Sequence, residues 1–378
     1  MKILHISNGY ADSKVHSQLT KAIDSRGIAQ IVYCPLREER LLGKNKFVGK
    51  HIEFAYSFCI KSWYKYVYHY KAHELYKDMK RQVDIKSADI IHAHTLFSDG
   101  VLAYKAHKEF GIPYVVAVRN TDVNDYIRLM KHTYCTGRKI VLNAEKIYFI
   151  SSSLKVTFEQ SDFIRPILNE VKDKFVLRPN GVDDYWHNHI SHESRTGHDV
   201  LYVGDYSANK NVVRLAKAII ELRQEKGLED VRLLIVGGEV KGGFRNNDGR
   251  TQAMIEAYPE AIKAFGKIYD KERLVEVMRR CSLFAMTSIH ETFGLVYIEA
   301  LSQNLPVVYT KGQGIDGLFD NKVGKGVNPL SIEEIKNAIR DILQNHDAYS
   351  NKDLDFRNFK WSEISERYVQ DYSIIVTN

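Results

Sequence analysis

The chain has 378 residues, of which 44% are hydrophobic and only 7 are prolines. This length exceeds one ordinary domain, and the composition can build sizeable cores, so we exclude extensive disorder and predict two domains of similar size. The 54 lysines and arginines outnumber the 47 aspartates and glutamates, which gives a formal charge of +7. Because this excess is small and dispersed, it does not indicate nucleic-acid binding. It suits phosphate-bearing substrates or an anionic membrane face equally well.

The cysteines lie far apart and form no CxxC pair; they are Cys34, Cys59, Cys135 and Cys281. This spacing fits neither a metal site nor a disulfide framework, and it favours a reduced, cytosolic setting. No run of about 18 apolar residues is present, and no charged segment leads into a long apolar one at the start. We therefore expect a cytoplasmic protein without a secretory signal, either soluble or peripheral on the inner face of the membrane.

Short β-branched runs alternate with longer helical patterns, which is typical of parallel α/β architecture. In the first half, the predicted strands are residues 2–7, 29–34, 89–93, 114–118 and 146–151. In the second half, the predicted strands are residues 200–203, 232–236, 283–287 and 306–309. The predicted helices of the second half include residues 212–226, 271–280, 297–303 and 332–344.

The two series are separated by a segment that contains Pro179, Asn180 and Gly181, a strong turn signal. We predict an N-terminal domain at residues 1–180 and a C-terminal domain at 181–361. Each is expected to be a doubly wound, Rossmann-like parallel sheet, and the two are expected to face one another across a cleft. In such sheets, ligands bind at the carboxyl ends of the strands.

The segment 288–310 carries the most specific pattern. A predicted strand ends, a short loop carries Glu291, and a helix begins near Gly294. Because Gly294 has no side chain, a phosphate group can approach the free N–H groups of the helix start. Glu299 follows in the helix, so two carboxylates flank an anion site, as a nucleotide sugar would require. The simpler alternative is a surface helix with solvated glutamates.

The string S-x-x-E-x-F-G-L-V-x-x-E-A, followed by P-V-V, resembles glycosyltransferase family 4 of the GT-B fold, whose nucleotide-sugar site carries an E-x7-E motif. The resemblance covers nearly the whole chain. It extends to the glycine-ended strands at 201–204 and 233–238, to Lys210, and to the segment 265–267, which in the family lies against the nucleotide base. It also implies that a C-terminal helix at 362–378 packs back on the N-terminal domain.

By this resemblance, Glu291 contacts hydroxyls of the donor sugar and Glu299 contacts the ribose hydroxyls. Lys210 neutralises the diphosphate, assisted by the backbone N–H groups of Gly294 and Leu295. Loss of a nucleoside diphosphate develops negative charge, which such groups stabilise without a metal. The other donor-site residues that the resemblance implies are Phe293, Gly204, Asp205, Gly237, Lys267 and Gly9.

The chain departs from the family at three places. The family's glycine-rich loop after the first strand is reduced here to Asn8, Gly9 and Tyr10. Asp205 stands where the family has an arginine that contacts the diphosphate, so another base, Arg245 or Arg214, would have to replace it. The family often has a histidine after the fourth N-terminal strand, where this chain has Arg119 and Asp122. We expect these two residues to face the cleft and to contact donor or acceptor.

The leading hypothesis is a retaining, metal-independent glycosyltransferase without a cofactor, acting on a nucleotide-sugar donor, with UDP as the default. The acceptor would be a hydroxyl of a growing surface polysaccharide or lipid-linked glycan. One alternative is another GT-B activity on nucleotide sugars, such as an epimerase. A second alternative is a catalytically weak nucleotide-sugar-binding protein, which the replacement at Asp205 suggests.

Two further patterns have competing interpretations. His92 and His94 alternate on one predicted strand. They could be metal ligands, but the simpler interpretation is that they are strand-end or core histidines. Residues 44–81 hold 10 aromatic and 9 basic residues against 3 acidic ones. Lysines around an aromatic face suit the headgroup layer of an anionic membrane. The alternative is an amphipathic helix packed on the N-terminal domain.

Overall fold

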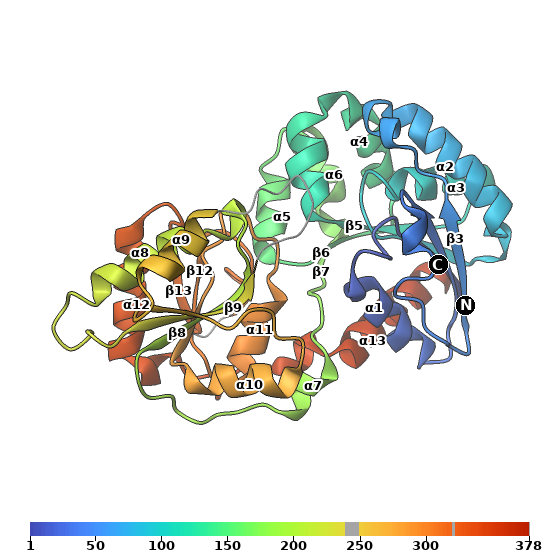
Figure 1. Ribbon diagram of the computed structural model, residues 1–378. Helices are drawn as coiled ribbons and strands as arrows, with labels where there is room; N and C mark the ends of the chain where they lie inside the picture. The colour runs from blue at the N-terminus through green and yellow to red at the C-terminus, as the bar shows by residue number, and fades with distance from the viewer. Residues whose placement is uncertain (239–248, 320–321, 378) are drawn as a thin grey trace. The chain divides into compact units, whose positions relative to one another are not determined.

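A computed structural model describes residues 1–238, 249–319 and 322–377 (Figure 1). The chain divides into two compact units. The N-terminal unit comprises Met1–Ile150, Leu154–Gly181 and Asn358–Asn378, and the C-terminal unit comprises Ser151–Ser153 and Val182–Arg357. Within the described residues, no helix is both long enough and apolar enough to cross a membrane.

The N-terminal unit contains a seven-stranded parallel sheet in the order β3-β2-β1-β4-β5-β6-β7. Its strands are β1 (Lys2–Ile6), β2 (Ala29–Leu36), β3 (Ile52–Phe58), β4 (Ile90–Ala93), β5 (Tyr114–Val118), β6 (Lys146–Phe149) and β7 (Phe175–Leu177). The strand order reverses between β1 and β4, where Ile3 pairs with Ile90. This reversal is the topological switch point at which doubly wound sheets bind their ligands.

Helices accompany this sheet and bury apolar side chains against it. They are α1 (Lys14–Asp24), α2 (Tyr68–Gln82), α3 (Gly100–Phe110), α4 (Tyr134–Asn143), α5 (Ser152–Glu159), α6 (Leu168–Val171) and α13 (Trp361–Thr377), with a π-helical turn at Asp122–Ile127. Short 3-10 turns lie at Glu39–Leu41, Ser62–Tyr66, Ile85–Ser87, Lys131–Thr133, Arg165–Ile167 and Lys172–Lys174.

The C-terminal unit contains a six-stranded parallel sheet in the order β10-β9-β8-β11-β12-β13. Its strands are β8 (Asp199–Asp205), β9 (Arg232–Gly238), β10 (Ile262–Ala264), β11 (Leu283–Ala285), β12 (Val307–Thr310) and β13 (Gly324–Val327). Its helices are α7 (Asp184–Asn188), α8 (Val212–Leu222), α9 (Gly249–Ala257), α10 (Lys271–Arg280), α11 (Leu295–Ser302) and α12 (Ile332–Gln344). Further 3-10 turns lie at Ala208–Lys210, His346–Tyr349 and Phe356–Phe359.

Two doubly wound parallel sheets confirm the expected fold class. The predicted strands are all present, with ends shifted by at most two residues, and α10 and α12 have the predicted bounds. Four strands were not predicted, namely β3, β7, β10 and β13. Helix α8 ends at Leu222, short of the predicted residue 226, because the chain turns before Gly227, whose φ is +83°.

The C-terminal helix α13 returns to the N-terminal unit and packs against α1. Its Asp371 is buried and forms ion pairs with Lys146 and, at 2.9 Å, with Arg178. The hydroxyl of Tyr148 donates to the same carboxylate at 3.0 Å. A buried carboxylate that is bonded by three donors anchors the end of the chain on β6 and β7.

We predict that Asp371→Asn lowers the free energy of unfolding by about 3 kcal/mol, because it leaves two half-buried cations without their partner. Urea unfolding measures the change. The matched control is Glu366→Gln on the same helix, which breaks the exposed ion pair with Arg26 and should cost less than about 1 kcal/mol. Equal losses in both variants would contradict the anchoring role of Asp371.

Candidate functional site

Two glycines pair where the parallel strands β8 and β9 end. Gly204 pairs with Gly237, whose φ is +145°. A Cβ at Gly237 would lie 1.7 Å from the carbonyl oxygen of Gly204, so no other residue fits. The two glycines therefore leave bare backbone at the sheet edge, as close approach of a phosphate group requires.

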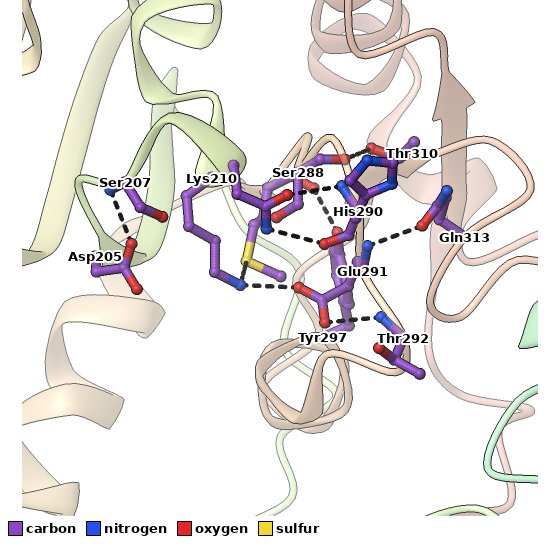
Figure 2. Close-up of polar contacts among 12 residues, drawn as sticks. Asp205, Ser207, Lys210, Ser288, His290, Glu291, Thr292, Tyr297, Thr310 and Gln313 are labelled. Atoms are coloured by element: carbon purple, nitrogen blue, oxygen red, sulfur yellow. Dashed lines mark hydrogen bonds and ion pairs between the residues drawn. The ribbon is translucent and has the colours of Figure 1, made fainter. Parts of the chain in front are cut away.

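Lys210 and Glu291 form an ion pair beside this edge. Lys210 ends the 3-10 turn after β8, and its Nζ lies 2.9 Å from Oε2 of Glu291 and 3.8 Å from Sδ of Met286. Figure 2 shows the lysine side chain extended towards the carboxylate. The two side chains are only 22% and 14% exposed. Each charge therefore offsets much of the desolvation cost of the other.

The loop between β11 and α11 holds Glu291 in place. The N–H of Glu291 donates to Oε1 of Gln313 at 2.8 Å, and the N–H of Gly314 donates to the carbonyl of Glu291 at 2.9 Å. The side chain of Asn209 bonds both backbone groups of His290, at 3.0 and 3.1 Å. These bonds join the lysine turn and the glutamate loop, so the ion pair rests on a connected backbone.

Gly294 begins helix α11 in the left-handed region, with φ +74°. A Cβ there would lie 2.6 Å from the ring of Tyr297, which is buried and donates its hydroxyl to the carbonyl of Met286. Glycine is therefore required by both conformation and packing. Leu295 is the first helical residue, as expected, whereas Phe293 is buried and contributes packing to this loop.

Glu299 lies on the next turn of α11. Burial raises the pKa of its carboxyl to about 7; the charge of Lys271 and a hydrogen bond from Trp186 oppose this rise, and Asp183 adds to it. Lys271 is itself paired with Asp183 at 2.6 Å. Glu299 thus sits among residues of α7 and α10, and its oxygens can accept hydrogen bonds from hydroxyl groups.

Asp205 has a local structural function. Its Oδ1 accepts from the N–H of Ser207 at 2.8 Å, and this bond caps the turn that leads to Lys210. Of the expected replacement bases, Arg214 donates to Asn211 at 2.9 Å, and Arg245 lies outside the described residues. Lys267 lies at the sheet edge, since its Cε is 3.9 Å from where a Cβ of Gly238 would stand.

Arg119 and Asp122 follow β5 in the N-terminal unit. Both oxygens of Asp122 accept backbone N–H groups: Oδ2 from Leu96 at 3.0 Å and Arg119 at 2.8 Å, and Oδ1 from Phe97 at 3.0 Å. Burial raises the pKa of Asp122 to about 6, and these bonds oppose the rise. This carboxylate ties the loops after β4 and β5 together. Arg119 donates to the carbonyl of His94 and to Asn180, both at 3.3 Å.

Sequence reasoning missed Asp99, which precedes α3. Its Oδ1 accepts from the N–H of Asn8 at 3.1 Å, and its Oδ2 is buried without a hydrogen-bond partner among the described residues. Burial raises the pKa of this carboxyl to about 7. Asp99 therefore borders the loop that carries Gly9, a position that no local motif indicates.

Histidines gather in the same unit. His5, His92 and His94 are fully buried, as expected of core residues, and one nitrogen of each lies within 4.8 Å of the other two. His16 of α1 contacts His94. The alternation of His92 and His94 was visible in the sequence, but their contact with His5 and His16 depends on the fold.

Known glycosyltransferases resemble this chain in sequence and in fold. Residues 186–358 match the model of the family described as Glycosyl transferases group 1. An uncharacterized glycosyltransferase of Methanocaldococcus jannaschii is 23% identical over 283 residues, which span 72% of this chain and 70% of that protein.

Solved structures share the whole fold. Sucrose-phosphate synthase from Thermosynechococcus elongatus has a TM-score of 0.73 at 17% identity, covering 100% of this chain and 99% of that one. HepE of Anabaena, in complex with UDP, has a TM-score of 0.71 at 17% identity, covering 99% and 100%. The comparisons therefore show the GT-B fold and support a glycosyltransferase enzyme.

We predict that Gly294→Ala destabilises the C-terminal unit more than Gly312→Ala does. Both glycines have φ near +74°, but nothing lies within 4 Å of a Cβ at Gly312. Left-handed strain costs each variant about 1–2 kcal/mol, and the contact with Tyr297 should add about 1–3 kcal/mol at Gly294. Urea unfolding measures the difference, and equal losses would show that the helix start tolerates a side chain.

Proposed function

We propose that the protein is a retaining, metal-independent glycosyltransferase that moves a sugar from a UDP-linked donor to a hydroxyl acceptor. The observation that carries the proposal is the Lys210–Glu291 ion pair at the carboxyl edge of the C-terminal sheet, 2.9 Å between charged atoms. It places a cation that can bind phosphate beside a carboxylate that can bind sugar hydroxyls. The E-x7-E pattern of the sequence supports the same assignment.

In this proposal, the diphosphate of the donor lies against the bare backbone of Gly204 and Gly237 and the start of α11. Negative charge develops on the leaving diphosphate as the glycosidic bond breaks. Lys210 and the N–H groups at the helix start are already in place, so they stabilise this charge without reorganising. Lys267 supplies a second cation at the edge where the family has its arginine.

Glu291 accepts hydrogen bonds from hydroxyls of the donor sugar, and its loop bonds orient it for that purpose. Glu299 accepts from the ribose hydroxyls, which its partly neutral state at pH 7 still permits through a free oxygen lone pair. The UDP preference is supported by HepE, which was also solved in complex with UDP-glucose. The proposed acceptor is a surface polysaccharide or a lipid-linked glycan.

The N-terminal unit also presents an aromatic surface to solvent. Its exposed side chains include Phe58, Trp63, Tyr66 and Tyr70, with exposed fractions of 45–75%, beside Lys61 and Lys65. Nζ of Lys65 lies 4.8 Å from the ring centre of Tyr66. Residues 44–81 do not form one amphipathic helix, because the segment contains strand β3, a 3-10 turn and most of α2. We propose that this surface binds anionic membranes and brings the enzyme to a lipid-linked acceptor.

We predict that Lys210→Ala and Glu291→Ala each lower turnover at least about a hundredfold, as loss of a charge-stabilising group does. Release of nucleoside diphosphate from a panel of nucleotide sugars, with and without sugar acceptors, measures it. The control Lys336→Ala breaks a pair with Glu333 on helix α12 and should retain activity.

Several results would contradict the proposal. Wild-type rates in either site variant would exclude the site, and activity that disappears with EDTA and returns with Mn²⁺ would exclude a metal-free reaction. Tight nucleotide binding without any turnover would favour the binding-protein alternative. An anomeric proton signal that shows inverted configuration in the product's NMR spectrum would exclude a retaining reaction.

Membrane binding has its own prediction. The full-length protein should cosediment with phosphatidylglycerol vesicles more than with phosphatidylcholine vesicles, and salt should weaken this binding. Tyr66→Ser should weaken it several-fold. Tyr269→Ser is the control, because Tyr269 is 86% exposed but lies in the C-terminal unit. Equal effects of both substitutions, or no binding by the wild type, would refute the proposed surface.

A further inference from the structure

Three imidazoles form a hydrogen-bonded chain near the switch point of the N-terminal sheet. His5 lies on β1, His94 follows β4 and His16 lies on α1. Nδ1 of His5 is 3.1 Å from Nε2 of His94, and Nδ1 of His94 is 3.0 Å from Nδ1 of His16. All three side chains are buried. Each bond needs one protonated and one bare nitrogen.

The side-chain amide of Gln30 determines which ring nitrogens of the three histidines carry protons. Nε2 of Gln30 donates to the carbonyl of Thr20 at 3.0 Å, so its Oε1, 3.1 Å from Nε2 of His5, must accept. His5 therefore carries its proton on Nε2 and accepts on Nδ1. His94 must then donate from Nε2 and accept on Nδ1, and His16 must donate from Nδ1. Nε2 of His16 is left as a bare hydrogen-bond acceptor.

This assignment requires neutral rings, and their surroundings keep them neutral. Burial lowers the pKa of His5 to about 4, and burial together with the charges of Arg119 and His5 lowers that of His16 to about 3. Burial and the neighbouring histidines hold the pKa of His94 well below its usual value, and Arg119 adds to this effect. Each ring then has one proton, and the chain has one consistent arrangement.

The bare nitrogen of His16 borders Gly9, in the loop between β1 and α1. A Cβ at Gly9 would lie 3.7 Å from Nε2 of His16, and apart from Gly9 and its neighbours Asn8 and Tyr10 no other described residue has a heavy atom within 4 Å of that point. The absent side chain leaves space beside the nitrogen. The carboxyl end of β1 at a switch point is where a ligand is expected.

We infer that Nε2 of His16 accepts a hydrogen bond from a hydroxyl group of the bound sugar substrate. Gln30, His5 and His94 act as positioning residues, because they fix the tautomer that leaves this nitrogen bare. The assignment rests on the proposed glycosyl transfer for the identity of the ligand, and on the hydrogen bonds between neutral rings for the tautomers. A divalent cation held by His5, His92 and His94 is the competing use of these rings, and the buried charge of Arg119 opposes it.

The tautomers can be measured on the full-length protein with 15N-labelled histidine, by long-range 1H–15N correlation spectra. His16→Asn, His5→Asn and His94→Asn assign the signals. We expect the proton on Nδ1 of His16 and on Nε2 of His5 and His94. A proton on Nε2 of His16 would overturn the inference, and so would stoichiometric binding of added Zn²⁺ that shifts the three rings together.

The ligand is tested with His16→Asn, whose amide retains the donor towards His94 but lacks the acceptor at Nε2. Loss of one neutral hydrogen bond should lower kcat/KM for transfer about threefold to tenfold. A raised KM for the acceptor alone assigns the hydroxyl to the acceptor. A raised KM for the donor, in hydrolysis and in transfer, assigns it to the donor sugar.

Gln30→Leu tests the positioning residues without changing His16. It removes the acceptor for His5, so it should mix the tautomers of His16 and reproduce part of the loss of kcat/KM seen in His16→Asn. The control is His107→Asn on α3, whose ring bonds the carbonyl of Ile112, and it should behave as wild type. Unchanged kinetics in His16→Asn, with an active wild type, would overturn the inference. A wild type that turns over no nucleotide sugar would refute the proposed function instead, and the tautomer spectrum would still decide the proton arrangement.

Discussion

The Lys210–Glu291 ion pair is the constraint on which the C-terminal unit's site depends. Two charges that are mostly removed from water are stable only when they stay together, so the turn after β8 and the loop after β11 must hold a fixed separation. Asn209 bonds the glutamate loop, and Gln313 and Gly314 bond it from the other side. The pair offers a cation and a hydrogen-bond acceptor together, which is the chemistry that the proposed nucleotide-sugar donor requires.

Glycines provide the second constraint, because they determine how closely backbone can approach. Without a Cβ, Gly237 of β9 avoids a clash with the carbonyl oxygen of Gly204 on β8. Gly294, at the start of α11, likewise avoids a clash with the ring of Tyr297. Both positions expose backbone where a diphosphate would lie. In the N-terminal unit, a Cβ at Gly9 would make only an ordinary contact, 3.7 Å from Nε2 of His16.

The alternation of strands and helices predicted the fold class, and the string around Glu291 predicted the strand, loop and helix that carry it. Three of the four missed strands have weak patterns: β7 and β10 have three residues each, and β13 reads Gly-Lys-Gly-Val. The fourth, β3, has seven residues and lies in the aromatic segment 44–81, for which no strand was predicted. In the sequence, Asp205 was interpreted as the loss of a phosphate contact. The structure shows in addition that its carboxylate accepts from the N–H of Ser207 and so caps the turn before Lys210. Asp122, Asp99 and the histidine chain depend on contacts between distant segments, which spacing along the chain does not reveal.

We propose that Lys210 and Glu291 form a chemical site and not only a structural ion pair. The most direct measurement exchanges the two charges in the double variant Lys210→Glu, Glu291→Lys and follows both urea unfolding and nucleoside diphosphate release. We expect the double variant to fold with stability near that of the wild type, because an ion pair is retained, but to transfer no sugar. Near-wild-type transfer by the exchanged pair would contradict it.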